Sequence, residues 1–472
     1  MSEPNTPLPI RAKLFHGIGA IAFGIKDNGF AYFLLLFYTT VIGLPSALVG
    51  TALLIAMVLD ALSDPIIGYW SDRTQSRWGR RHPFMYAAAL PVAACYALLW
   101  NPPNWGTQGL FFYLLSMAVL IRTLITLFET PSTALLPELT SDYDERTAVQ
   151  SWRLFFGWSG GTTLAIIMFG FLLVPTLEQP IGTLNRQGYA TYGWLAGGII
   201  FVAILVSALG TQRFVRYRGP EPSSSVGSLK GVFHEITETL VNRNFFALFM
   251  SSIAGAVATG LTASVAFLLL TYFWEFSSRQ IFYWTSLIVV SALIGLLIAP
   301  RIAKRLGKKR AVIGLGMVAF AIQPLPIVLR LFNLLPENGD PALFPIVATI
   351  NVLDLGLIIA MQAVLGSMVA DLVEQSEVST GRRNEGVFFS AMTFIRKTNQ
   401  GIGIFVAGLL LQFVGFPDGV APGTVDDSIL WNLGALLVPC QLILWGLMLW
   451  ALVYYQIDKE AHAAHLSQLG RE

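Results

Sequence analysis

The chain has 472 residues, of which 54% are hydrophobic and 12% are charged, and its formal net charge is +2 at pH 7. Soluble domains contain about 25% charged residues, so this composition excludes a soluble protein and indicates a polytopic membrane protein. The near-neutral charge, without a dense basic or acidic tract, gives no support for nucleic-acid binding.

The N-terminus is short and polar over residues 1–9, without the apolar core and cleavage site of a signal peptide. We therefore expect the first membrane span to act as an uncleaved insertion signal. Cys95 and Cys440 lie within hydrophobic segments, which predicts free buried thiols rather than a disulfide.

Windows of about 20 apolar residues predict an all-α protein with twelve membrane-spanning helices. Lys and Arg gather in the loops after every second span, so the positive-inside rule predicts that both termini are cytoplasmic. Tryptophans near the span ends are typical of interfacial belts, and we assign them no ligand role. The predicted span centres are Phe23, Met57, Ala93, Thr123, Ile166, Ile204, Gly260, Ala292, Phe320, Leu357, Val406 and Leu442.

The longest polar interval, Gln212 to Arg243, divides the predicted spans into six and six. The sequence thus predicts an N-terminal six-helix bundle over 1–211, a cytoplasmic linker over 212–243 and a C-terminal six-helix bundle over 244–472. The tripeptide Gly-Arg-Arg at 79–81 is echoed by Gly-Lys-Lys at 307–309, a weak internal repeat. Two such halves are typical of transporters that bind substrate between repeats near the membrane midplane.

Asp60 and Asp64 lie one helical turn apart within the apolar stretch from Ser46 to Trp70. A carboxylate at this depth costs on the order of 2.5–3.5 kcal/mol, so the pair needs neutralisation. The i, i+4 spacing puts both side chains on one helix face. A shared proton or sodium ion is the simplest neutralising partner, although a structural pair satisfied by a neighbouring Lys or Arg is the alternative.

Other charged residues fall within the predicted spans. Helix rise places Asp60 roughly 15 Å and Lys397 roughly 18 Å from their cytoplasmic helix ends, close to the centre of a core about 30 Å thick. Charges from both halves therefore converge on one level, as a central cavity requires. They are Lys26, Asp27, Arg122, Glu129, Arg153, Asp354, Arg396 and Lys397.

The fourth span presents Arg122, Thr126 and Glu129 on one face. Hard cations prefer oxygen ligands, so Thr126 and Ser63 are candidate hydroxyl ligands for a cation held by the two aspartates. Glu129 and Arg153 stand at similar distances from the turn near Asp142, so they can form an ion pair.

Each of these residues also has a structural interpretation. Glu129 and Arg153 could form a helix-to-helix ion pair without touching substrate. Lys26 could snorkel to an interface, and Arg122 could neutralise Glu129. Adjacent positions on a helix point about 100° apart, so only one of Arg396 and Lys397 is expected to face a cavity. Asp354 receives no partner from the sequence.

A second charge cluster lies at the cytoplasmic end of the tenth span. Its residues can be read as a solvated helix end, or as a cytoplasmic gate that pairs with the Arg-rich loop after the second span. The predicted gate comprises Asp72, Arg73, Arg80, Asp371, Glu374 and Arg382.

In these motifs the chain resembles the glycoside–pentoside–hexuronide:cation symporters of the major facilitator superfamily, typified by the bacterial melibiose permease. The resemblance covers nearly the whole chain, and its strongest stretches run from Asp60 to Arg80, from Glu129 to Arg153 and from Asp371 to Lys397. It implies the major facilitator fold of two six-helix halves and a multi-pass protein of the cytoplasmic (inner) membrane, with a monomer as the default.

The resemblance also assigns roles. It implies a cation site at Asp60, Ser63, Asp64 and Thr126, and sugar contacts from Asp27, Glu129, Arg153 and Lys397. The melibiose permease has Asp in place of Glu129, Asn in place of Ser63 and a sugar-stacking Trp in place of Thr133, which argues against a melibiose-like galactoside. Arg122 is an addition that could favour an anionic sugar, and Lys26 is grouped with the candidate substrate-binding residues.

We therefore expect a sodium- or proton-coupled symporter of a sugar or glycoside that works by alternating access. Lysophospholipid transport is the alternative, because an animal branch of the same group carries lipids. The five histidines show no metal-ligand spacing within a span, so we expect neither an enzyme nor a cofactor. The chain has no phosphate-binding Gly-rich loop with its Lys, which argues against ATP-driven transport.

Overall fold

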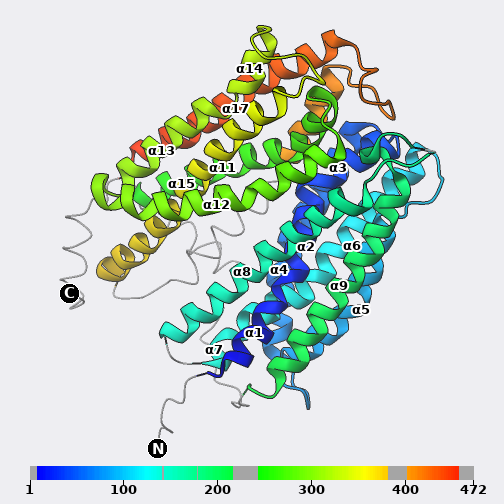
Figure 1. The fold of residues 1–472 in the computed structure, drawn as a ribbon. Helices are drawn as coiled ribbons and strands as arrows, with labels where there is room; N and C mark the ends of the chain where they lie inside the picture. Colours follow the sequence, from blue (N-terminus) through cyan, green and yellow to red (C-terminus); the bar gives the residue numbers. More distant parts are fainter. Residues whose placement is uncertain (1–7, 141–142, 178, 216–242, 381–400, 456–472) are drawn as a thin grey trace, which may run out of the picture. The chain divides into compact units, whose positions relative to one another are not determined.

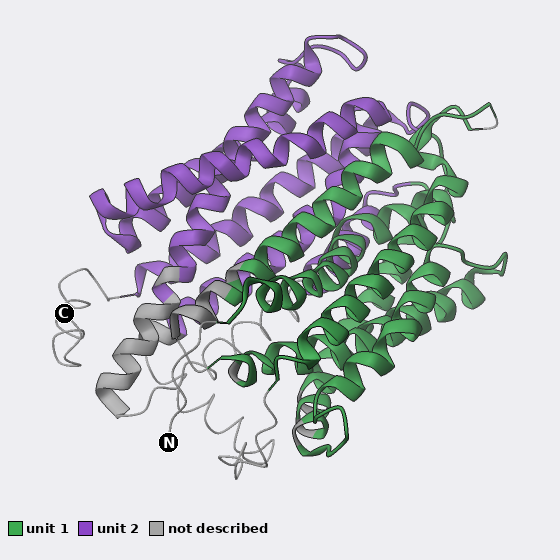
Figure 2. Ribbon diagram, turned by 60° about the horizontal axis from the view of Figure 1, so that its bottom comes forward, with its two compact units in different colours: residues 1–225, 417–421 green, residues 226–416, 422–472 purple. Residues whose placement is uncertain are grey.

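The computed structural model describes residues 8–140, 143–177, 179–215, 243–380 and 401–455. These residues form helices and connecting loops, without a strand in the ranges described (Figure 1). Two compact units contain them (Figure 2). Unit 1 comprises Met1–Ser225 with Pro417–Ala421, and unit 2 comprises Val226–Phe416 with Pro422–Glu472. Most of the predicted linker lies outside the described residues, so its extent stays a prediction.

Unit 1 begins with a broken membrane span, Ile10–Val41, in which short α-helical pieces alternate with wider π-helical turns. Its pieces are α1 (Ile10–Ile18), α2 (Ala20–Asn28), η1 (Gly29–Phe33), α3 (Leu34–Leu36) and η2 (Phe37–Val41). The remaining elements are α4 (Ser46–Arg73), α5 (His82–Leu99), α6 (Thr107–Ala134), α7 (Leu136–Leu139), α8 (Tyr143–Ile167), η3 (Met168–Leu172), η4 (Gly182–Leu184) and α9 (Arg186–Gln212).

Unit 2 repeats the plan of long apolar helices. They are α11 (Arg243–Leu268) with η5 (Leu269–Phe273), α12 (Ser278–Leu306), α13 (Lys308–Ile322), α14 (Leu325–Leu331), α15 (Leu343–Thr380), a helix over Gly401–Phe413 and α17 (Asp427–Val453). A buried aromatic stack, Phe320 on Trp445 with ring centroids 4.3 Å apart, lies in its hydrophobic core.

Within the described ranges, eleven helices are long and apolar enough to cross a membrane, and each contains one of the predicted centres. The remaining centre, Val406, lies in the shorter helix Gly401–Phe413, which directly follows undescribed residues. Large apolar side chains are exposed on these helices, for example Leu296 at 69% and Phe112 at 63%. Such surfaces are unfavourable in water and suit a hydrocarbon environment. Cys95 and Cys440 are free, as predicted, although both are half-buried rather than fully buried.

Local backbone geometry recurs between the units. The first span and α11 both end in a π-helical turn, after which the Leu44 amide donates to the Tyr38 carbonyl and the Phe276 amide donates to the Leu270 carbonyl. A residue of positive φ follows each turn. In unit 1 this residue is Gly43, with a φ of 80°, and in unit 2 the φ is 50° at Glu275.

The weak repeat in the sequence shows the same agreement. Gly79 and Gly307 have φ values of 87° and 78°, and each precedes the next long helix by a few residues at most. An L-residue rarely adopts this backbone region, so glycine suits both loops.

Glycines also bring helices into close contact in both units. A Cβ on Gly24 of α2 would lie only 1.9 Å from the carbonyl oxygen of Gly157 on α8. In unit 2, a Cβ on Gly403 would lie 2.2 Å from the carbonyl oxygen of Val257 on α11. Small residues permit such backbone approach, which is typical of helix packing in membranes.

Candidate functional site

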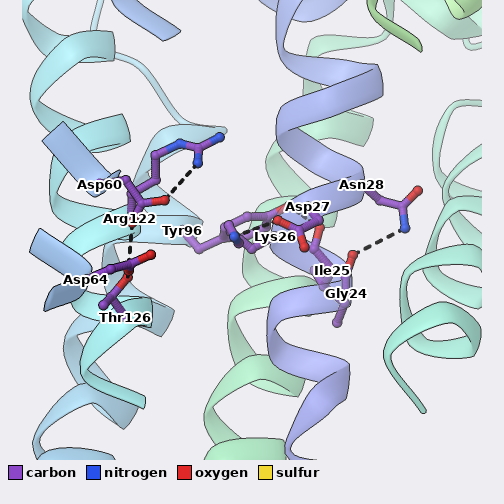
Figure 3. A network of polar contacts seen from close by, with 10 residues as sticks. All are labelled: Gly24, Ile25, Lys26, Asp27, Asn28, Asp60, Asp64, Tyr96, Arg122 and Thr126. Atoms are coloured by element: carbon purple, nitrogen blue, oxygen red, sulfur yellow. Dashed lines mark hydrogen bonds and ion pairs between the residues drawn. The ribbon is translucent and has the colours of Figure 1, made fainter. Parts of the chain in front are cut away.

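Asp60 and Asp64 of α4 face α6, because these two helices pack along each other. The Thr126 hydroxyl oxygen on α6 lies 3.0 Å from Oδ1 of Asp60 and 2.9 Å from Oδ1 of Asp64 (Figure 3). Asp60 is 2% exposed and Thr126 is fully buried. The i, i+4 spacing on α4 thus presents two carboxylates to one hydroxyl.

The Thr126 hydroxyl carries a single proton, so it can donate to only one of the two carboxylates at a time. The other contact then places two lone-pair-bearing oxygens about 3 Å apart. A proton on that carboxylate, or a cation held among the three oxygens, turns this contact into an attractive one. The geometry is therefore suited to a small cation.

Arg122 is one helical turn before Thr126 and donates from Nη1 to Oδ2 of Asp60 over 3.2 Å. Its guanidinium also lies 4.8 Å from the ring centroid of Phe30 in η1, a cation–π contact. Arg122 thus neutralises Asp60 and not Glu129, the partner that its own helix suggested. Asp60 therefore has a cationic partner in this structure, as the structural alternative for the aspartates describes.

Lys26 forms an ion pair with its neighbour, Nζ lying 2.6 Å from Oδ1 of Asp27 (Figure 3). The Lys26 side chain is 2% exposed and that of Asp27 is 62% exposed. Lys26 therefore does not snorkel to an interface but is buried within unit 1. The exposed carboxylate of Asp27 can accept hydrogen bonds from a ligand.

Arg153 of α8 is 6% exposed, and its guanidinium lies 5.0 Å from the ring centroid of Phe23. Glu129 lies within electrostatic range of Arg153, and an ion pair between the two stays a prediction. Phe23 and Phe30 are two helical turns apart on the first span, with Lys26 between them. The cationic groups of Lys26, Arg122 and Arg153 therefore all lie along the stretch of this span from Phe23 to Phe30.

The charges of this cluster do not balance. Its acids, all described, are Asp27, Asp60, Asp64 and Glu129, and its bases are Lys26, Arg122 and Arg153. Counted over the described residues alone, which exclude Lys397, the cluster has four carboxylates and three cations.

The other predicted ligand, Ser63, donates its hydroxyl to the carbonyl oxygen of Asp60 over 2.9 Å along its own helix. Its place in the cation site stays a prediction. Thr133, at the position of the stacking Trp of the melibiose permease, is exposed and donates to the carbonyl of Glu129. Lys397 and Arg396 lie outside the described residues.

The predicted gate includes a contact that the sequence did not indicate. Arg80 and Arg81 both donate from Nε to Oε1 of Glu138 in α7, over 2.7 and 2.6 Å. The Arg-rich loop is thus anchored within unit 1. Arg73 is exposed at the end of α4. The side chains of Asp72, Asp371 and Glu374, and the whole of Arg382, lie outside the described part, so their gating role stays a prediction.

The comparisons with known proteins agree with this architecture. Residues 15–459 match the family described as MFS/sugar transport protein. The isoprimeverose transporter of Lactiplantibacillus pentosus is 25% identical, over 96% of this chain and 90% of that protein. The inner membrane symporter YicJ of Escherichia coli (strain K12) is 24% identical, over 87% of this chain and 84% of that protein.

Among solved structures, the nucleoside transporter NupG superposes with a TM-score of 0.60 at 12% identity, covering 99% of this chain and 100% of that one. This similarity shows the fold, and the family match places the chain in the major facilitator superfamily. The family match covers nearly the whole chain. Together with the membrane spans, it identifies the protein as a multi-pass membrane transporter and not an enzyme. The chain belongs to the MFS/sugar transport protein family, the glycoside–pentoside–hexuronide:cation symporters.

Proposed function

We propose that the chain is a secondary symporter that couples a cation bound at Asp60, Asp64 and Thr126 to the uptake of a sugar or glycoside. The observation that carries the proposal is the single Thr126 hydroxyl within 3.0 Å of both carboxylates. Placement in the cytoplasmic (inner) membrane with both termini cytoplasmic is part of the proposal.

Arg122 limits the position in which this cation can bind. Its Nη1 already occupies Oδ2 of Asp60, so the cation takes the side of the pair formed by the two Oδ1 atoms and Thr126. The incoming charge repels the guanidinium, and any weakening of the Arg122–Asp60 contact frees a donor for substrate. This link gives a physical route for cation and sugar to raise each other's affinity, as coupling requires.

The sugar contacts follow from accessibility and charge. Asp27 offers an exposed carboxylate to substrate hydroxyls, and Arg153 offers donors. Glu129, Lys26 and Lys397 complete the proposed binding set. Relatives of this chain include a protein named as an isoprimeverose transporter, which supports this class of substrate.

A second candidate substrate, an anionic sugar such as a hexuronide or a sulfonated sugar, is favoured by one observation. The Nε of Arg122 and the Nη1 of Arg153 are buried without a hydrogen-bond acceptor among the described residues. Guanidinium groups bind carboxylates and related anions through paired hydrogen bonds. An acidic substituent on the sugar would satisfy these donors.

The test is thermal unfolding of the purified full-length protein with a panel of neutral and acidic glycosides, with and without sodium and at several pH values. A ligand that binds the folded state raises the melting temperature by mass action. We expect a glycoside-dependent rise that grows with sodium or with acidification. Acidic glycosides should lose their effect in Arg122→Met, whereas neutral ones should keep theirs.

Thr126→Val and Thr126→Ser provide the matched pair for the cation site. Valine keeps the shape without the hydroxyl and should weaken the cation effect at least tenfold, whereas serine should retain it. If no glycoside shifts the melting temperature under any condition, the sugar assignment is wrong. Lysophospholipid transport in liposomes would then be the assay of choice.

A further inference from the structure

Unit 2 contains a cavity of about 140 Å³ lined by its own helices. Residues of α11, η5, α12, α14, α15 and α17 contribute to its wall, together with Gln323 directly after α13. Most of the wall is apolar. The polar side chains that line it include Thr262, Gln323, Asn351, Asp354 and Gln441.

Asp354 is the one carboxylate among the described residues of this wall. It is 3% exposed, and helix rise places it roughly 16 Å from the start of α15, near the middle of a membrane core about 30 Å thick. No described lining residue is Lys, Arg or His. An ionised carboxylate in such surroundings is costly unless a cation accompanies it.

Several acceptor oxygens of the cavity wall have no hydrogen-bond partner in the described part of the chain. Among the described residues, Oδ1 of Asp354 and the Oε1 atoms of Gln323 and Gln441 are buried without a hydrogen-bond partner. The Gln441 amide nitrogen instead donates to Oγ1 of Thr262 over 3.2 Å. Three unpartnered oxygens from three helical segments therefore belong to one small chamber that includes a single formal charge.

We propose that this chamber is a second cation site, which binds a sodium-class monovalent ion through Asp354, Gln323 and Gln441. A lone proton would give Asp354 one donor and satisfy one acceptor, whereas a hard cation attracts all three oxygens at once. Divalent cations favour sites with a higher charge than one carboxylate supplies. The chamber exceeds the volume of one water molecule, so water can supply further ligands.

This site is separate from the proposed one at Asp60 and Asp64, because every lining residue belongs to unit 2. Its existence does not depend on which sugar is carried. If both sites take sodium, the purified protein binds two sodium ions per chain, and each site can be removed alone.

The test is equilibrium binding of radioactive sodium to the purified full-length protein, in a choline buffer free of other alkali cations. Asp354→Asn is expected to lower the stoichiometry by one ion per chain, and Asp60→Asn with Asp64→Asn to remove the other. Gln441→Met keeps the carboxylate and should weaken the second site about tenfold. Glu337→Gln changes an exposed loop carboxylate and should leave binding unchanged.

The outcomes separate this inference from the proposed function. Sodium that remains bound to Asp354→Asn at the first site shows that the variant is folded. If Asp60→Asn with Asp64→Asn leaves sodium binding unchanged while Asp354→Asn abolishes it, the unit 2 site stands and the first site does not bind sodium, so the proposed function then requires a proton there. Unchanged sodium stoichiometry in Asp354→Asn overturns the inference, including the case in which the chamber takes only a proton or water.

Discussion

The two units differ in how a buried carboxylate at membrane depth is neutralised. In unit 1 the fourth span carries Arg122, which contacts Asp60 across the α4–α6 interface. In unit 2 the corresponding span, α15, carries Asp354, whose cavity contains neutral amides and no described cation. The comparison teaches that one half has an internal cation for its carboxylate, whereas the other depends on an ion from outside.

Among the variants that test this difference between the units, Arg122→Met is expected to change the stability of the protein most. It leaves the buried Asp60 without its cation, and removal of one partner from a buried ion pair costs about 3–5 kcal/mol of folding free energy. The melting temperature of the purified protein in sodium-free buffer should fall, and sodium should restore part of the loss. Arg122→Lys, which keeps the charge, should lose less. A melting temperature equal to that of the wild type would contradict the structural role of the pair.

Asparagine substitutions at the two aspartates are expected to have opposite signs. Asp354→Asn removes an uncompensated carboxylate, so in sodium-free buffer it should stabilise unit 2 by about 1–3 kcal/mol. Asp60→Asn leaves Arg122 unpaired and should destabilise the protein. Thermal unfolding of both variants, measured side by side without sodium, tests the contrast. A shift of the same sign in both would mean that the units handle charge alike.

The close helix contacts should instead make the units behave alike. Gly24→Ala and Gly403→Ala each push a methyl group against a backbone carbonyl and should cost about 1–3 kcal/mol. Gly198→Ala in α9 is the control, because a Cβ there meets nothing within 4 Å. Alanine at that position should be neutral or stabilising by up to about 1 kcal/mol. Melting temperatures that leave all three variants level with the wild type would rule out this packing.

The smallest effect concerns the turn that follows the first span of each unit. Glu275 has a φ of 50° where the equivalent turn of unit 1 has Gly43 at 80°. Glu275→Gly should relieve strain and stabilise the protein by about 0.5–1 kcal/mol net of the entropy of glycine. Gly43→Ala should destabilise it by about 1–2 kcal/mol. Equal melting temperatures for the two variants would show that the positive φ at these two positions does not determine the stability of the turns.

Much of the architecture could be predicted because membrane spans are long and nearly free of charge. All twelve predicted centres fall in helices, and helical periodicity alone put Asp60 and Asp64 on one face. The approach of Thr126 to both also agrees with the prediction, because its position on α6 follows from the same periodicity.

Contacts that depend on how the helices are rotated against each other could not be predicted from the sequence. Arg122 stands seven residues before Glu129, so a partner on its own helix was the simplest choice, but α4–α6 packing gives it Asp60. Glu138 was missed as the partner of Arg80 because it follows a proline in a short helix far along the chain. The chamber around Asp354 was also missed, because its other ligands are neutral amides that give no charge signal.

The Arg122–Asp60 pair has a consequence for the transport cycle as well. A guanidinium tethered to the fold is held near its carboxylate at an effective concentration in the millimolar range or above, and it cannot diffuse away. Asp60 therefore keeps a counter-ion when no external ion is bound. In the proposed symport cycle, Asp60 therefore does not expose a bare buried charge in the unloaded state, and the coupling ion competes with Arg122 for this carboxylate.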